Sequence, residues 1–253
     1  MALLPEIRKV ARTGAFVAMT GAIIAICRAH IAVGRPDARD QIYSVHLHRL
    51  MRNVFRLFNV RMKVLREPPP PTAKARLIVA NHRSAMDIAV LLELFEARIV
   101  SRADLASWPV LGSAAKLGGA IFVDRDEGAS RATALRAMRT QLEDGYTVGI
   151  FAEGGTFEGD EVRPLHPGAF LAARGLSVDI VPVGLAYEKG AEFVGESFVE
   201  HLGNIARRRG SSVVVSVGTP IPIRNGARDL AAEVRAAIQV LVDEARVELE
   251  RMR

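Results

Sequence analysis

The residues most able to do chemistry are a histidine and an aspartate five positions apart. His82 and Asp87 follow the apolar run 77–80, within the segment Asn-His-Arg-Ser-Ala-Met-Asp. On one continuous helix these positions lie roughly 140° apart, so the side chains can meet only where a strand turns into a helix. An ionised aspartate bonded to one imidazole nitrogen fixes the tautomer and leaves the other nitrogen free to take a proton. The pair is therefore a candidate general base with its orienting group.

The spacing by itself is a weak signal, because such pairs also occur by chance in a chain of this composition. The alternative is a helix-capping turn whose histidine is only a satisfied polar group. Ser84 is predicted to cap a helix that begins near residue 85. Asp87 then lies in the first helical turn, where the helix dipole favours an ionised carboxylate.

Composition limits the class of protein. The chain has 253 residues, of which 49% are hydrophobic, enough for one large α/β domain or one domain with an appendage. Its single cysteine, Cys27, excludes an intrachain disulfide and a metal site built from several cysteines, and it favours a reducing compartment. No His-Glu-x-x-His or paired Cys-x-x-Cys motif is present, so we do not expect a metal site.

The positive charge belongs to the N-terminal quarter. Residues 1–67 hold 12 basic and 4 acidic residues (+8), which leaves 22 basic and 24 acidic residues (−2) in the rest of a chain with net charge +6. This quarter has no zinc-finger spacing and no aromatic-rich ribonucleoprotein strand, so nucleic acid is not expected as a partner. Its basic residues alternate with apolar ones instead, which favours an anionic membrane surface.

Two helices are predicted in this quarter. The uncharged run 14–27 is shorter than the roughly 20 residues that span a bilayer, so a helix lying in or dipping into one leaflet fits best. A signal peptide and a buried core helix remain alternatives. Positive charge on both sides of the run gives no orientation. A second helix over 37–59 has an apolar stripe and an arginine-rich face, which suits either its own domain or anionic lipid.

The prolines at 68–71 interrupt any helix, so residues 68–75 are predicted to be a linker between a basic amphipathic helical segment, 1–67, and a folded domain, 76–253. In that domain strand-like runs alternate with helical segments, which predicts an α/β fold with a mainly parallel or mixed sheet covered by helices. The expected strands are 76–80, 97–101, 120–123, 147–151, 178–183 and 213–217. The expected helices are 85–95, 109–117, 129–143, 167–174 and 228–251, and Gly145 is a candidate C-cap for the third.

Three further blocks fall at predicted strand ends, where ligands of such sheets usually bind. The block 119–125 ends in Arg125, which could bind a phosphate or carboxylate, or could pair with a neighbouring aspartate. The block 151–156 holds Glu153 before two glycines, which permit close approach of a ligand or simply form a turn. The block 180–183 contains Pro182, a candidate pocket wall.

Together the four blocks resemble the 1-acylglycerol-3-phosphate acyltransferase family of glycerolipid and lysophospholipid acyltransferases. Its pattern is Asn-His-x4-Asp, Gly-x-x-Phe-Ile/Val-x-Arg, Phe-Pro-Glu-Gly-Thr-Arg/Ser and Val-Pro-Val/Ile, and the resemblance covers roughly residues 76–222. It implies that His82 is the general base, that Asp87 holds it, and that the acceptor's polar head is bound by Arg125, Glu153, Gly154 and Thr156. It implies no metal and no cofactor.

The third block departs from the family pattern. Ala152 replaces the usual proline, Gly155 the usual threonine, and Thr156 stands where arginine or serine often follows. The arginine that would help bind an acceptor phosphate is therefore missing, and Arg163 is a candidate substitute. The same stretch, 151–159, also resembles the version found in lyso-ornithine lipid acyltransferases.

The resemblance implies transfer of an acyl group from acyl-ACP or acyl-CoA to the free hydroxyl of a lysolipid, on the cytoplasmic face of the inner cell membrane. The preferred acceptor is 1-acylglycerol-3-phosphate, giving phosphatidate, with lyso-ornithine lipid or another lysophospholipid as the alternative. An alternative of another class is a catalytically inactive peripheral lipid-binding protein.

Overall fold

The computed structural model describes residues 3–252 except 72–74, 125–126, 196 and 224–225. In this described part the chain forms a seven-stranded sheet with the order β1-β7-β6-β2-β5-β3-β4. All neighbouring strands are parallel except β6 and β7, which confirms the expected mixed, mainly parallel sheet. The strands are β1 (Val60–Val64), β2 (Ala75–Ala80), β3 (Arg98–Arg102), β4 (Ile121–Val123), β5 (Val148–Ile150), β6 (Val178–Tyr187) and β7 (Ser211–Val217).

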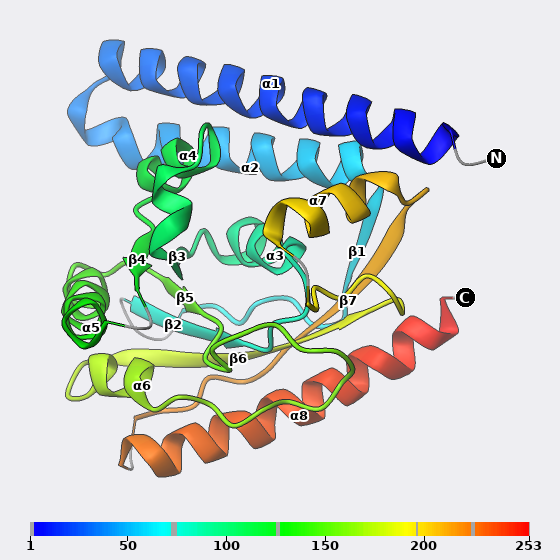
Figure 1. Cartoon of the computed structure of the whole chain (residues 1–253). Helices are drawn as coiled ribbons and strands as arrows, with labels where there is room; N and C mark the ends of the chain where they lie inside the picture. The colour runs from blue at the N-terminus through cyan, green and yellow to red at the C-terminus, as the bar shows by residue number, and fades with distance from the viewer. Residues whose placement is uncertain (1–2, 72–74, 125–126, 196, 224–225, 253) are drawn as a thin grey trace.

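Helices cover both faces of the sheet, with the α1–α2 pair and α8 on opposite sides (Figure 1). One face is covered by α1 (Leu3–Val33), α2 (Arg39–Phe58), α3 (Met86–Phe95) and α7 (Phe198–Arg207), with α4 (Leu111–Leu117) beside them. The other carries α5 (Gly128–Glu143), α6 (Gly168–Ala173) and α8 (Ala227–Arg251). Two short 3-10 helices, η1 (Pro36–Ala38) and η2 (Ala103–Ser107), join elements on the first face.

The central strands β2 and β6 are mainly apolar, as expected for strands with both faces buried, and their charged residues, Arg76 and Asp179, lie near their N-terminal ends. In β2, Ile78 and Ala80 face the layer that contains α3, whereas Leu77 and Val79 face the layer that contains α8. The strand ends where this apolar run ends. Its carboxyl end therefore delivers the segment 81–85 to the edge of the sheet, directly before α3.

The expected helical segment 1–67 is wrong at its C-terminal end. Residues Val60–Val64 form β1, which pairs in parallel with β7 from Val60 opposite Ser211 onwards. Charged residues alternate with apolar ones along β1, a pattern typical of an edge strand with one face toward solvent. Of the predicted linker 68–75, residues 68–71 have no regular structure, 72–74 lie outside the described residues, and Ala75 already belongs to β2.

Two further features were absent from the sequence prediction. Helix α7 begins at a capping box, in which Ser197 and Glu200 satisfy each other's backbone N–H groups. Strand β6 continues four residues past the expected end, to Tyr187, because it pairs with β7 there. The predicted stop after α5 is confirmed, since Gly145 follows the C-cap residue Asp144 with φ 88°.

Helix α1 is longer than the apolar run 14–27 suggested, at 31 residues. Among the helices of the described residues, it alone is long and apolar enough to cross a membrane, by length and composition. One side packs on α2, with the Phe16 and Phe58 ring centroids 5.7 Å apart. The opposite side exposes the apolar side chains of Leu3, Leu4, Ile7, Val10, Val17 and Ile26. This exposed face indicates membrane association.

Candidate active site

The structure brings His82 and Asp87 together at the carboxyl end of β2. His82 Nδ1 lies 2.7 Å from Asp87 Oδ2, which is hydrogen-bond distance. The Asp87 side chain is fully buried, whereas the His82 side chain is 15% exposed. With Nδ1 engaged, Nε2 is left without a hydrogen bond to any described residue. The geometry is that of an imidazole whose outer nitrogen can accept a proton.

The segment between the two residues folds around the Asp87 carboxylate. Asp87 Oδ2 also accepts hydrogen bonds from the backbone N–H groups of Arg83 (2.6 Å) and Ser84 (2.8 Å). Asp87 lies in the first turn of α3, as predicted. One carboxylate oxygen thus fixes both the turn and the imidazole.

The predicted cap at Ser84 is wrong. Helix α3 begins after Ala85, with no side-chain cap hydrogen bond, and Ser84 Oγ accepts only a long bond, 3.4 Å, from the N–H of Met86. The backbone N–H groups of Arg83 and Ser84, just before the helix, donate to the Asp87 carboxylate instead.

The imidazole of His82 lies flat against an aromatic ring. Phe151, directly after β5, stacks on it with ring centroids 4.0 Å apart and planes 11° apart. Phe151 is buried, so one face of the imidazole is shielded from water. The position and orientation of the imidazole therefore depend on two neighbouring strands, because His82 follows β2 and Phe151 follows β5.

Glu153 has a different place from the one expected of an acceptor-binding residue. Its side chain is fully buried and forms an ion pair with Arg83, at 2.8 Å. Glu153 Oε2 accepts hydrogen bonds from the N–H of His82 (2.7 Å) and from Arg83 Nη1. Glu153 Oε1 accepts from Arg83 Nη2 (3.2 Å) and from the N–H of Arg163 (2.8 Å). Both oxygens face protein groups, so Glu153 holds the backbone of His82 rather than an acceptor.

Arg83 uses all of its donors in the same cluster. Beyond Glu153, its guanidinium donates to the carbonyl groups of His82 (2.7 Å), Gly159 (2.6 Å) and Glu161 (2.8 Å). A guanidinium has five N–H groups, and these contacts account for all five. Arg83 therefore ties the segment 153–161 to the segment that carries His82. No role for Arg83 was predicted from the sequence, although an arginine between an apolar strand and an apolar helix was a signal.

Comparisons with known proteins identify the family. A family model described as "Acyltransferase" matches residues 61–186. The chain belongs to the lysophospholipid acyltransferase family. It is 32% identical to a lyso-ornithine lipid O-acyltransferase of Pseudomonas aeruginosa, over 65% of this chain and 66% of that protein. It is 27% identical to a 1-acyl-sn-glycerol-3-phosphate acyltransferase of Neisseria meningitidis, over 61% of this chain and 58% of that protein.

The fold has a close counterpart among solved structures. The crystal structure of the 1-acyl-sn-glycerophosphate (LPA) acyltransferase PlsC from Thermotoga maritima superimposes with a TM-score of 0.78, at 18% sequence identity. The match covers 96% of this chain and 95% of that one. The N-terminal helices are therefore part of a shared architecture.

The remaining predicted site residues of this acyltransferase-family chain are Gly154, Thr156 and Arg125. Gly154 has φ 80°, and a Cβ there would lie 2.6 Å from His166 Nε2, so glycine is required for the turn. Thr156 is half-buried in the segment beside His82, where the next N–H, of Phe157, donates to the His82 carbonyl at 3.3 Å. Arg125 lies outside the described residues.

Arg163, the suggested substitute for the missing arginine, lies in the same segment. Its guanidinium is half exposed, pairs with Glu161 at 3.1 Å, and lies 5.6 Å from the centre of the Phe157 ring. The guanidinium is thus accessible from solvent, although it is paired with Glu161. In the described part of the chain, no group of three or more His, Cys, Asp or Glu side chains is arranged to hold a metal ion.

A second histidine, His201 of α7, contacts the segment between His82 and Asp87. Its Nε2 accepts a hydrogen bond from the N–H of Ala85 (3.3 Å) and lies 3.1 Å from Ser84 Oγ. Phe193 stacks on the imidazole at 4.6 Å, and its N–H donates to the carbonyl of Arg83 at 2.7 Å. This contact could not be predicted from the sequence, because α7 lies more than a hundred residues after Ser84.

Asn81 directly precedes His82 at the end of β2. It forms two hydrogen bonds to the backbone of Leu185 in β6, one from its amide nitrogen (2.9 Å) and one to its amide oxygen (2.8 Å). Asn81 is fully buried. The asparagine before the histidine therefore anchors the end of β2 to the neighbouring strand.

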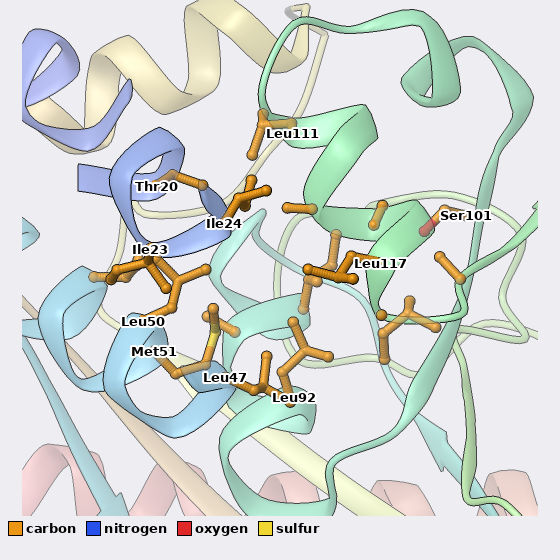
Figure 2. A pocket seen from close by; sticks show the side chains of 18 of the residues that line it. Thr20, Ile23, Ile24, Leu47, Leu50, Met51, Leu92, Ser101, Leu111 and Leu117 are labelled. Atoms are coloured by element: carbon orange, nitrogen blue, oxygen red, sulfur yellow. The ribbon is translucent and has the colours of Figure 1, made fainter. Parts of the chain in front are cut away.

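An apolar pocket opens beside this site, with a volume of about 190 Å³. It reaches Ala85 and Met86, between the His82 segment and Asp87. Side chains of α1, α2, α3 and α4 point into it, as Figure 2 shows, and Phe198 and Leu202 of α7 also line it. Those labelled there include Ile23, Ile24, Leu47, Leu50, Met51, Leu92, Leu111 and Leu117. Tyr43 also lines the pocket and stays uncharged, because burial raises its pKa to about 12.

Proposed function

We propose that this protein transfers an acyl group from an acyl thioester to the free hydroxyl of a lysolipid, with His82 as the general base and Asp87 as its orienting group. The observation that carries the proposal is the 2.7 Å contact between His82 Nδ1 and Asp87 Oδ2 beside an apolar pocket. The two curated relatives described above are matched over 66% and 58% of their length, so their activities are starting points for this chain.

In the proposed reaction His82 Nε2 takes the proton of the lysolipid hydroxyl as its oxygen attacks the thioester carbonyl. The tetrahedral intermediate then collapses, and the C–S bond breaks. The leaving thiolate receives the proton from the imidazolium, so the products are an ester and a free thiol. No enzyme nucleophile is needed. Asp87 holds the ring in the correct tautomer and offsets the positive charge that forms on it.

The apolar pocket is proposed to hold a fatty acyl chain with its carbonyl end at Ala85 and Met86. Leu92 lies on the same helix, α3, about 9 Å further along the axis. Leu92→Trp is therefore expected to lower kcat/KM about tenfold or more for long-chain acyl donors and to leave donors of about eight carbons or fewer nearly unaffected. The measurement is kcat/KM over a series of acyl-CoA chain lengths.

Leu94→Trp is the matched control, because Leu94 lies on the same helix outside the pocket lining. A uniform loss for all chain lengths in Leu92→Trp would contradict the placement of the acyl chain. A selective loss in Leu94→Trp would contradict it too.

The acceptor head group is proposed to lie against the segment that begins at Gly154, with Arg125, Thr156 and Arg163 as its polar contacts. Acceptors named in the relatives are lyso-ornithine lipid and 1-acyl-sn-glycerol 3-phosphate. The second is the preferred acceptor, with phosphatidate as product. The test is a panel of lysophosphatidate, other lysophospholipids and lyso-ornithine lipid, each offered with acyl-ACP and acyl-CoA. Failure of every acceptor with both donors would favour the inactive lipid-binding alternative.

Membrane attachment is proposed through the exposed face of α1, at the cytoplasmic face of the inner membrane, where both thioester donors are available. Deleting residues 1–67 would not test this cleanly, because Phe16 and β1 belong to the folded core. Leu4 and Ile7 are 69% and 54% exposed. The double variant Leu4→Asp and Ile7→Asp is expected to bind anionic vesicles several-fold more weakly, since apolar burial and charge attraction both decrease.

Val240→Asp is the control for this prediction, because Val240 is 58% exposed on α8, across the sheet from α1 (Figure 1). Binding is measured by co-sedimentation with vesicles. Equal sedimentation of the double variant and the wild type would remove the exposed face of α1 as the attachment site.

A further inference from the structure

The two oxygens of the Asp87 carboxylate differ in their hydrogen bonds. Its Oδ2 takes three hydrogen bonds, from His82 Nδ1 and from the N–H groups of Arg83 and Ser84. Its Oδ1 is buried and has no hydrogen bond of ordinary geometry to any described residue. A buried carboxylate oxygen without a donor is costly, so a partner for Oδ1 is expected nearby.

The side chain of Tyr187 lies beside the Asp87 carboxylate and interacts with it. It is the last residue of β6 and is 2% exposed. Its hydroxyl is likewise buried and has no hydrogen bond of ordinary geometry to the described residues. Burial raises the pKa of Tyr187 well above its usual value, and the neighbouring Asp87 carboxylate raises it further. The phenol is therefore neutral and can act as a donor.

The backbone of Tyr187 is held in place from two sides. Arg246 of α8 donates to the Tyr187 carbonyl at 2.9 Å and forms an ion pair with Asp160 at 2.6 Å. Tyr187 is also paired with Val213 in the antiparallel β6–β7 ladder. The backbone that carries the Tyr187 ring is thus fixed by strand pairing and by Arg246.

We propose that Tyr187 is a positioning residue for the catalytic pair: its hydroxyl donates to Asp87 Oδ1, so that Oδ2 stays directed at His82. This inference rests on the proposed role of His82 as base. Tyr187 acts through Asp87 and contacts neither substrate. It would thereby hold the carboxylate in the one orientation that orders the imidazole.

The proposal predicts a pH effect, so the charged and titratable groups around the pair matter. The Arg83–Glu153 ion pair lies on one side of the His82 segment, His201 of α7 on another, and Arg246 of α8 behind Tyr187. None of these is changed by Tyr187→Phe. That substitution removes one hydroxyl and keeps the ring.

Tyr187→Phe is expected to lower kcat roughly tenfold with unchanged KM for donor and acceptor. Without the phenol, more of the carboxylate's negative charge acts on the imidazolium, so His82 keeps its proton to higher pH. The acid limb of the pH profile of kcat/KM should therefore move to higher pH. A purely structural role would reduce stability without moving this limb.

A second measurement does not depend on activity. The titration midpoint of the His82 imidazole, followed by NMR and assigned with His82→Ala, should rise in Tyr187→Phe. Tyr146→Phe is the matched control and should leave kcat and the midpoint unchanged, since Tyr146 lies against Arg98 on the far side of β5. In an Asp87→Asn background, Tyr187→Phe should cause no further loss.

An unmoved midpoint and acid limb in folded Tyr187→Phe would overturn the inference, as would full additivity with Asp87→Asn. If His82→Ala keeps its activity, the proposed function fails. The NMR midpoint then still reports whether Tyr187 acts on Asp87.

Discussion

His82→Ala is expected to lower acyl transfer by about 10²–10⁴-fold, the usual contribution of a general base, and to leave the fold and vesicle binding unchanged. The imidazole packs on Phe151 but is partly exposed, so its removal opens no enclosed cavity. The measurement is the initial rate with a saturating thioester donor, together with circular dichroism and vesicle co-sedimentation.

His48→Ala is the matched control for this prediction. His48 is also a partly exposed histidine that contacts carboxylates, Glu93 and Glu96, but it lies on α2 away from β2's carboxyl end. It should keep full activity. Wild-type rates in His82→Ala would remove the general-base mechanism and with it the proposed function.

The second large effect is expected at the buried ion pair of Arg83 and Glu153. Glu153→Leu leaves the Arg83 guanidinium buried without its counter-charge, which should lower the free energy of unfolding by about 3–5 kcal/mol. It also removes the acceptor for the His82 N–H, so kcat should fall with little change in the acceptor's KM. Urea unfolding and steady-state kinetics measure the two effects.

A double variant separates stability from positioning. Replacing a buried ion pair by apolar residues of similar size is often neutral, so Arg83→Met with Glu153→Leu should recover much of the lost stability. The activity should stay low, because the backbone of His82 has still lost its carboxylate. The exposed pair Arg139–Glu143 is the control, and Glu143→Leu should change stability by less than about 1 kcal/mol.

Steady-state kinetics of Glu153→Leu also test the expectation from the sequence that Glu153 binds the acceptor. A rise in the acceptor's KM with unchanged kcat would support that expectation and contradict a positioning role. The structure favours positioning, because Glu153 is fully buried and both of its oxygens accept hydrogen bonds from protein groups.

Most helices and strands were predictable because their signals are local. The expected strand 76–80 begins within one residue of the observed start of β2, and Gly145 marked the end of α5. Strand β1 was missed because an edge strand with alternating charges looks like a polar extension of α2. Helix α7 was missed although its capping box, Ser197 and Glu200, was readable.

The five-residue spacing of His82 and Asp87 determined by itself that the two side chains could meet only across a strand–turn–helix junction, because that constraint is a matter of local backbone geometry. Tertiary structure alone decided what surrounds them. Glu153, Tyr187 and His201 lie 71, 105 and 119 positions after His82 in the chain, and parallel strand pairing and helix packing place them around one carboxylate and one imidazole. Such contacts depend on strand order and register, which local residue patterns do not encode.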